Sequence, residues 1–209
     1  MKIAIIGTGK MATGLGKLWS KAGHNVVFGS RDPAGRQGVV REVGGVSQVV
    51  THDQAMSGAE VVVLTTPYLD VEPFAREHSD KLRGKVVVDI TNPFDPVPAG
   101  GVSGPEVTAK AIGQGARVVA AFKTNFAGVL DQPVDASGVQ RDVFYCGDDA
   151  VAKEAVRRLI DATGFRPVDC GTLKAARALD PMVPLMIEMD RRLGGKGLGR
   201  RSHWKFVTP

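Results

Sequence analysis

The first strand-like run of this chain ends in a glycine-rich turn that leads directly into a helix. Residues 3–6 are apolar, Gly7-Thr8-Gly9-Lys10-Met11-Ala12 follows, and residues 11–21 carry apolar side chains at helical spacing. This is the G-x-G-x-x-A form of the dinucleotide-binding fingerprint. Gly7 permits a tight turn, Gly9 lets the backbone approach a pyrophosphate, and Ala12 lets helix and strand pack closely. The alternative is a plain glycine turn, but the position between strand and helix favours a nucleotide whose phosphates face the helix N-terminus.

Short apolar runs alternate with longer amphipathic segments along the first 125 residues. We expect strands at 3–6, 26–28, 49–50, 61–64, 86–90 and 118–122, with helices at 11–21, 71–78 and 105–112. Thr51 and Gln54 form a capping-box pattern for one further short helix. The strands are continuous Val/Ile/Leu runs, which is typical of parallel strands buried on both faces. This repetition predicts an α/β fold, a Rossmann-type doubly wound and mostly parallel sheet.

Residues 126–209 continue as a smaller α/β extension. Strands are expected at 143–146 and 167–170, and a helix at 149–162. A long closing helix over 173–193 contains Pro181 and Pro184, which are expected to kink it or split it in two. We therefore divide the chain into a dinucleotide-binding core, residues 1–125, and a C-terminal extension, residues 126–209, that packs on the core in a single compact unit.

The composition fits an enzyme of the cytoplasm that binds an anionic cofactor. The chain has 209 residues, two cysteines, no signal-peptide pattern and no apolar run that would span a membrane. Its net charge of +5 also suits nucleic acid, but the cations are scattered and aromatic residues make up only 6%, so an aromatic-interleaved basic stripe is lacking. The four histidines lack metal-ligand spacing. We expect no metal, no membrane partner and no nucleic-acid partner.

The end of the second strand indicates which dinucleotide binds. NAD enzymes usually carry Asp or Glu about twenty residues after the fingerprint, where the carboxylate binds the ribose 2′-hydroxyl. This chain has Gly29-Ser30-Arg31 there, and a hydroxyl beside a guanidinium suits a 2′-phosphate. Arg36 is a second candidate cation, and we expect the Asp32 carboxylate to point away as the loop turns. NADP(H) is therefore predicted; the alternative is an exposed Arg31 that permits either cofactor.

Three further strands end in small polar residues. These ends are Thr65-Thr66-Pro67-Tyr68, Asp89-Ile90-Thr91-Asn92-Pro93 and Phe122-Lys123-Thr124-Asn125. Ligands of open α/β sheets bind at the carboxyl ends of the strands, so we expect these residues to line a nicotinamide crevice. The alternative is that they only cap the strands. The candidate cofactor-binding residues here are Thr65, Thr66, Pro67 and Asn92.

In this order, the motifs resemble those of the deazaflavin-coenzyme:NADP oxidoreductase family and its dinucleotide-binding relatives. The resemblance spans nearly the whole chain and extends to Cys146-Gly147-Asp148-Asp149 and Asp169-Cys170-Gly171. It implies a homodimer that transfers hydride between NADP(H) and a second flat redox partner, usually a deazaflavin. The site residues it implies are Thr8, Lys10 and Met11 beside the pyrophosphate and nicotinamide, Ser30 and Arg31 at the 2′-phosphate, and Thr66, Pro67 and Asn92 beside the nicotinamide.

Lys123 departs from this resemblance, because the relatives have Asn or His at that position. Burial in an apolar crevice disfavours the ammonium form, so Lys123 is a candidate general acid toward a carbonyl or imine that receives hydride. Alternatively it is a charged anchor for an anionic substrate or coenzyme tail, or a solvent-facing residue without function. Lys123, Asn92 and Thr66 are the candidate catalytic residues.

Together these features predict an NADP(H)-dependent oxidoreductase. The hydride acceptor or donor is a deazaflavin coenzyme or a small organic molecule such as an imine, carbonyl or activated alkene. A non-enzymatic NADP(H)-binding sensor that keeps the fingerprint is the alternative, since fold alone does not decide activity. The closing helix has more apolar residues than a thin lobe requires, and Met182, Leu185, Met186 and Met189 are predicted to face a second subunit.

Overall fold

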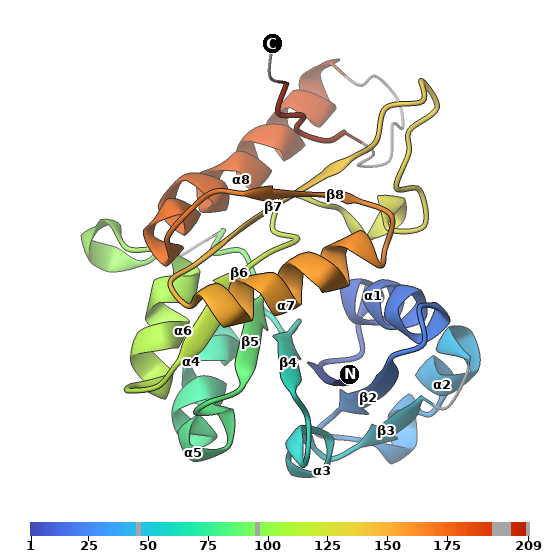
Figure 1. The fold of residues 1–209 in the computed structure, drawn as a ribbon, viewed down its shortest axis with the longest axis vertical. Helices are drawn as coiled ribbons and strands as arrows, with labels where there is room; N and C mark the ends of the chain where they lie inside the picture. The colour runs from blue at the N-terminus through green and yellow to red at the C-terminus, as the bar shows by residue number, and fades with distance from the viewer. Residues whose placement is uncertain (45–46, 95–96, 194–201, 208–209) are drawn as a thin grey trace.

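Within the residues that the structure describes, 1–44, 47–94, 97–193 and 202–207, eight strands form one sheet. In this computed structural model their order is β3-β2-β1-β4-β5-β6-β7-β8 (Figure 1). The strands are β1 (Lys2–Ile6), β2 (Asn25–Gly29), β3 (Gln48–Val50), β4 (Val61–Leu64), β5 (Val86–Asp89), β6 (Arg117–Ala120), β7 (Asp142–Gly147) and β8 (Arg166–Asp169). The first six are parallel, β7 is antiparallel to β6, and β8 is parallel to β7. This order confirms the predicted doubly wound fold, whose connections reverse direction between β1 and β4.

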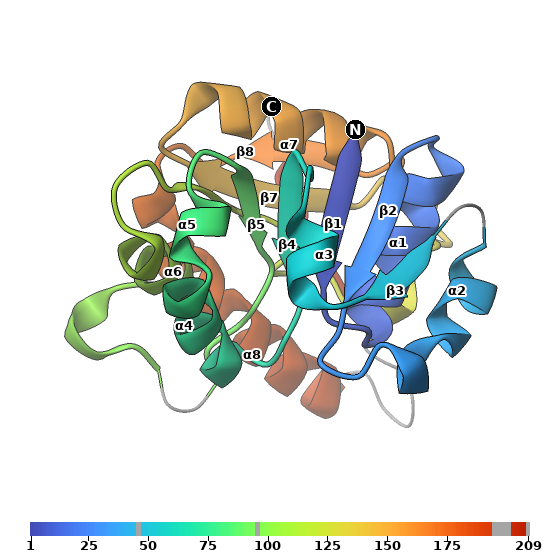
Figure 2. The same cartoon turned by 90° about the horizontal axis from the view of Figure 1, so that it is seen from below.

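Helices cover both faces of the sheet (Figure 2). They are α1 (Lys10–Lys21), α2 (Gly38–Val43), α3 (His52–Met56), α4 (Tyr68–Glu77), α5 (Ser79–Leu82), α6 (Gly104–Ile112), α7 (Ala150–Asp161) and α8 (Ala176–Leu193), with single turns η1 (Ala34–Arg36), η2 (Ala99–Gly101), η3 (Ala127–Val129) and η4 (Leu173–Ala175). Buried side chains of α1, α2 and α7 form one apolar core, and those of α3 to α6 and α8 form a second core on the opposite face. The sheet is thus the middle of three layers.

The first strand explains why the strand sequences lack alternation. Ile3 and Ile5 belong to the core under α1 and α7, whereas Ala4 and Ile6 belong to the core on the other face. All four side chains are fully buried because successive residues of a strand point to opposite faces and both faces are covered.

Several helices differ from the sequence-based expectation, among them α8 and α2. The alternative in which the prolines split the closing helix is wrong, because α8 runs through both Pro181 and Pro184. Each proline removes one helical hydrogen bond, and burial of Leu179, Val183 and Met186 on the same helix offsets that loss. The six-residue helix α2 was not predicted, since its Gly and Val residues favour other structure.

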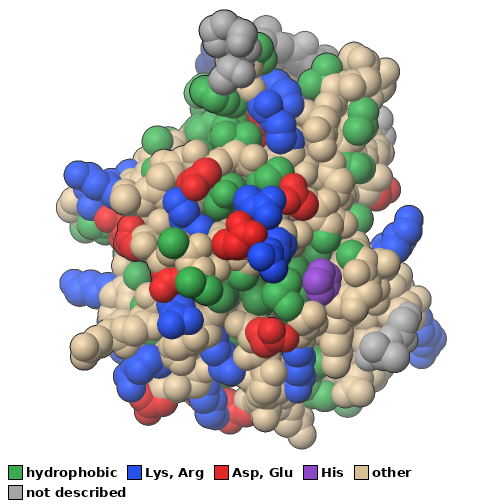
Figure 3. All heavy atoms as spheres, in the orientation of Figure 1, with side chains coloured by type: hydrophobic (Ala, Val, Ile, Leu, Met, Phe, Trp, Pro, Cys, Tyr) green, Lys and Arg blue, Asp and Glu red, His purple; other side chains and the backbone are tan. Residues whose placement is uncertain are grey.

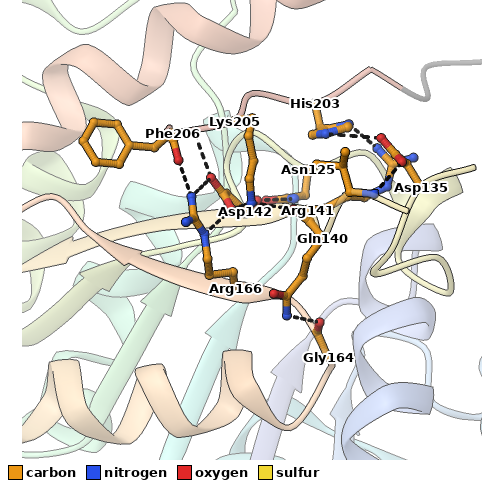
Figure 4. Close-up of polar contacts among 11 residues, drawn as sticks. Asn125, Asp135, Gln140, Arg141, Asp142, Gly164, Arg166, His203, Lys205 and Phe206 are labelled. Atoms are coloured by element: carbon orange, nitrogen blue, oxygen red, sulfur yellow. Dashed lines mark hydrogen bonds and ion pairs between the residues drawn. The ribbon is translucent and has the colours of Figure 1, made fainter. Parts of the chain in front are cut away.

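The C-terminal residues 202–207 return to the start of β7 (Figure 4). The buried Asp142 carboxylate accepts two hydrogen bonds from Arg166, both 2.7 Å, one from Lys205 at 2.8 Å and one from the N–H of Phe206 at 2.8 Å. Burial opposes ionisation of Asp142, but the hydrogen bonds from Arg166 and Lys205 outweigh it and lower the pKa of the carboxyl. Asp142 therefore fixes this end segment against the start of β7.

Candidate functional site

The fingerprint turn leaves the N-terminus of α1 open to an anion. Gly7 has φ +119°, and a Cβ there would lie 2.5 Å from Oγ1 of Thr65, so only glycine fits. Gly9 is the N-cap residue of α1, and no side chain of the described residues caps the helix. A Cβ at Gly9 would meet nothing within 4 Å, so the space above it is free. The first N–H groups of α1, whose first turn has no acidic residue, are available to a pyrophosphate.

A cavity of about 560 Å³ lies beside the end of β2. Ser30 and Arg31 contribute one wall, His52 of α3 a second, and Asp70 and Phe74 of α4 a third. The Arg31 side chain is 83% exposed, and its Nη2 lies 3.7 Å from Oδ2 of Asp70. Such an exposed, long ion pair is weak, so a bound phosphate can replace Asp70 as the partner of the Arg31 guanidinium.

The loop after β2 directs its carboxylate away from this cavity, as predicted. Ser30 Oγ accepts the N–H of Asp32 at 3.1 Å, and the Asp32 carboxylate accepts the N–H of Gly35 at 3.0 Å. Asp32 therefore stabilises its own turn. Arg36 lies exposed on η1 and is absent from the residues that line the cavity.

A second cavity, of about 360 Å³, opens at the ends of β4 and β5. It is lined by Thr66, Pro67, Tyr68, Leu69, Thr91, Asn92 and Phe94. Among the described residues, Oγ1 of Thr66 and Oδ1 of Asn92 are buried and have no hydrogen-bond partner. Buried polar atoms are rarely left unpaired. This hydroxyl and this amide oxygen fit a ligand that carries both a donor and an acceptor, as a carboxamide does.

Two other predicted site residues serve the protein scaffold. The Thr65 hydroxyl donates to the carbonyl of Ile6 at 2.7 Å, joins β4 to β1, and lines neither cavity. Asp89 is fully buried, and its carboxylate accepts hydrogen bonds from the N–H and hydroxyl of Thr91 and from the hydroxyl of Thr108. These bonds fix the backbone that leads into Asn92.

Lys123 points into the protein. Phe122 has φ +54°, a left-handed conformation that turns the chain after β6. The Lys123 side chain is 0% exposed; its Nζ donates to the carbonyl of Thr91 and lies 2.9 Å from Oδ1 of Asp180 on α8. The solvent-facing alternative is therefore wrong, because a buried carboxylate and a backbone carbonyl bind the ammonium. Burial raises the pKa of Asp180, while the charge of Lys123 opposes that rise.

The Lys123–Asp180 pair connects four elements around the second cavity. The side-chain amide of Asn92 donates to the carbonyl of Lys123 at 2.9 Å, and Nζ of Lys123 donates to the carbonyl of Thr91. Two hydrogen bonds of opposite direction therefore join residues 91 and 92 to residue 123. The second carboxylate oxygen of Asp180 accepts the N–H of Gly104 at 2.8 Å. The ends of β5 and β6, the start of α6 and the second turn of α8 are thereby joined. Sequence reasoning missed Asp180, whose one signal is an acidic residue within an apolar helical pattern.

Neither a metal site nor a membrane span is found in the described part of the chain. No cluster of three or more His, Cys, Asp or Glu side chains could hold an ion there. None of the described helices is both long and apolar enough to cross a bilayer.

Comparison with known proteins shows the family of the chain. Residues 2–93 match the family model described as NADP oxidoreductase, coenzyme F420-dependent. The F420-dependent NADP reductase of Methanothermobacter thermautotrophicus is 32% identical over 96% of this chain and 94% of that protein. The rat metalloreductase STEAP3 is 30% identical over 89% of this chain but only 37% of its own length.

Solved structures share the fold. A protein of Arthrobacter sp. FB24 that is assigned as an F420-dependent NADP reductase superposes with a TM-score of 0.83 and 28% identity, over 93% of this chain and 95% of that one. The alignment thus includes both the first six strands and the extension. The chain belongs to the family of coenzyme F420-dependent NADP oxidoreductases and is an NADP-dependent oxidoreductase.

Proposed function

We propose that this enzyme transfers hydride between NADP(H) and a deazaflavin coenzyme. The observation that carries the proposal is the row of three sites along the carboxyl edge of the sheet: the open N-terminus of α1, the cavity beside Arg31, and the unpartnered pair of Thr66 and Asn92. Along the strand order β2-β1-β4-β5, the helix N-terminus after β1 lies between the other two sites, and NADP(H) likewise has its pyrophosphate between the 2′-phosphate and the carboxamide. The relatives named as F420-dependent NADP reductases support a deazaflavin as the second substrate.

Each part of NADP(H) has a proposed set of contacts. The Gly7–Ala12 turn, including Thr8, Lys10 and Met11, binds the pyrophosphate and flanks the nicotinamide. Ser30 and Arg31 bind the 2′-phosphate. Arg36, on η1 after the same loop, is a second cation near this phosphate. Thr66 and Asn92 bind the carboxamide, and Pro67 packs beside the ring. The bound cofactor supplies the hydride, and the protein orients it.

The mouth of the second cavity suits a flat apolar partner. Leu69 and Phe94 are 62% and 56% exposed, and the ring of Tyr68 lies on the same wall. Exposed large apolar groups beside a polar recess commonly mark ligand surfaces. A deazaflavin ring system would cover them.

For Lys123 we propose a positioning role. Its ammonium is enclosed by Asp180 and the Thr91 carbonyl, and it is absent from the residues that line the cavity. An enclosed ammonium supports the shape of the site more readily than it donates a proton to a substrate. The roles of general acid and of anchor for an anionic tail are therefore not favoured.

We further propose a homodimer that works in the cytoplasm. Leu185 and Met189, four residues apart on α8, are 51% and 40% exposed and supply the contact surface. Met186 is only 3% exposed, so its predicted role in the dimer contact is wrong. Met182 is partly buried against the second core of its own subunit and stays a predicted contact residue. Met186 faces the core, whereas Met182 lies three residues before Leu185 on the same side of α8.

Surface charge does not favour a nucleic-acid partner. On the face that carries α7, cations and carboxylates are intermixed (Figure 3). Glu154 pairs with both Arg157 and Arg158, and Asp161 pairs with Arg157. A phosphate backbone requires a continuous basic surface, which such pairs do not supply.

Anaerobic stopped-flow mixing tests the proposed reaction. Enzyme loaded with NADPH is mixed with a deazaflavin, a cyclic imine or an activated alkene, and the loss of NADPH absorbance is followed. We expect rapid oxidation by the deazaflavin and slow oxidation by the others. Faster oxidation by an imine or enone would assign a small organic substrate instead. Binding without oxidation by any acceptor would indicate a sensor.

A further inference from the structure

Hydride transfer to a deazaflavin, imine or carbonyl also requires a proton at the heteroatom of the acceptor. We propose that Tyr68 is the catalytic residue that donates this proton. The proposal rests on the proposed function, because it assigns the acceptor to the cavity at the ends of β4 and β5. Tyr68 is the first residue of α4 and lines that cavity with Thr66 and Asn92.

Tyr68 is the titratable side chain among the described residues that line this cavity. Of its neighbours, the Thr91 hydroxyl already donates to Asp89 at 2.7 Å, and the Asn92 amide does not ionise near neutral pH. The other hydroxyl, of Thr66, is too weakly acidic to act as a general acid. The phenol is therefore the group whose chemistry matches proton donation.

The position of the ring is fixed by close packing. A Cβ at Gly104 would lie 3.0 Å from Cε2 of Tyr68 and 3.6 Å from Cδ of Pro93, so glycine provides the room that the ring occupies. Gly104 is itself held by its N–H bond to Asp180, which pairs with Lys123. The buried ion pair thus supports the proposed donor.

The electrostatic surroundings keep Tyr68 protonated. Burial raises the pKa of the phenol, and the negative charges of Asp89, Asp180 and Glu72 raise it further. Lys123 is the buried cation nearby, and Asp180 pairs with it. At neutral pH the side chain is therefore a phenol with a proton to give.

The proposed step balances as follows. The acceptor carbon forms a bond to the hydrogen that leaves C4 of the nicotinamide with its electron pair, so NADPH is oxidised and the acceptor reduced. The acceptor heteroatom forms a bond to the proton of the Tyr68 hydroxyl. The phenolate that remains takes a proton from water.

Tyr68→Phe and Tyr145→Phe form a matched pair of variants, because the chain has two tyrosines. Tyr145 is 5% exposed on β7 and lies outside the proposed machinery. In single-turnover reduction of a deazaflavin by bound NADPH, we expect Tyr68→Phe to lower the rate by about 10²–10⁴-fold. Its NADPH affinity should stay within about twofold of wild type, and Tyr145→Phe should react like wild type. Equal rates in Tyr68→Phe and wild type would overturn the assignment.

A second readout does not depend on turnover. In Tyr145→Phe, absorbance at the phenolate band reports Tyr68 alone, and it is recorded within seconds of an alkaline pH jump. We expect the Tyr68 midpoint to be lower with NADP⁺ than with NADPH, because only the oxidised nicotinamide ring is positively charged. Identical midpoints would show that the ring is not beside Tyr68. If wild type reduces no deazaflavin but shows the shift, the proposed acceptor and the assignment of Tyr68 as its proton donor both fail, and NADP(H) binding at this site stands.

Discussion

At the scale of single residues, the site depends on two hydrogen bonds that run in opposite directions between the ends of β5 and β6. Asn92 donates its amide to the backbone of Lys123, and Lys123 donates its ammonium to the backbone of Thr91. Asp180 completes the arrangement from α8 at 2.9 Å. A buried charge pair of this kind adds little net stability, but the loss of one partner leaves an uncompensated charge. Its contribution is geometric: it fixes where the Asn92 oxygen points.

Lys123→Met tests this account of the pair. The substitution keeps the volume and leaves Asp180 buried without its cation, so we expect a loss of about 3–5 kcal/mol in the free energy of unfolding. Asp180→Asn should also destabilise, and the double variant should recover part of the loss. Urea unfolding of the four proteins gives the coupling energy. Losses below about 1 kcal/mol in both single variants would contradict a paired, buried lysine.

Residue-level prediction succeeded where local sequence sufficed. The Gly7–Ala12 turn depends on neighbours a few positions away, and so does the Asp32 carboxylate, which accepts a hydrogen bond within its own turn. The burial of the Lys123 side chain does not depend on nearby residues, because its partner Asp180 lies on a helix more than fifty residues later. Burial of a lysine is decided by a distant carboxylate that no local pattern reveals.

At the scale of elements, α6 and α8 are clamped together at the edge of the second core. Ser103 and Glu106 form a capping box at the start of α6, and Arg177 of α8 binds both oxygens of Glu106 at 2.7 and 2.8 Å. The hydrogen bonds from Arg177 and Ser103 lower the pKa of Glu106 from 4.5 to about 2. Because Gly104 lies in the same first turn, the clamp also supports the wall beside Tyr68.

The clamp predicts a pH dependence of stability. The Glu106 carboxyl has a folded pKa below its unfolded value, so its contribution is complete above pH 4.5 and is lost as the pH falls toward 2. Because Arg177 is 39% exposed, we expect this contribution to be only about 1 kcal/mol. The difference in unfolding free energy between wild type and Glu106→Gln should be present at neutral pH and vanish near pH 2. A difference that persists unchanged at pH 2 would contradict the clamp.

Strands were easier to predict than helices in this chain. The run 61–64 is identical to β4, and the Thr51–Gln54 capping box at α3 is present. Buried parallel strands have a continuous apolar signature that neighbouring turns delimit. The split of α8 was a wrong alternative, because the local cost of two prolines is visible in sequence, whereas the burial that offsets it is not.

At the scale of the whole molecule, α8 is the surface that we propose for self-association. Wild type should sediment at micromolar concentration with twice the 22.1-kDa mass of the chain. Replacing exposed Leu185 and Met189 by Glu and Lys should yield a monomer with an unchanged circular dichroism spectrum. Val151→Glu, at a 71% exposed position on α7, is the matched control and should remain dimeric. A monomeric wild type would refute the dimer.

Recognition of the 2′-phosphate beside β2 decides which dinucleotide the protein prefers. The most direct measurement is the pair of dissociation constants for NADPH and NADH, obtained by fluorescence titration at one salt concentration. We expect NADPH to bind at least about tenfold more tightly, because a charge-assisted contact contributes about 1.5–3 kcal/mol. Arg31→Ala should weaken NADPH by about ten- to a hundredfold and NADH by less than about twofold, while Arg41→Ala on exposed α2 should change neither. Equal affinities of the wild type for NADPH and NADH would contradict the account.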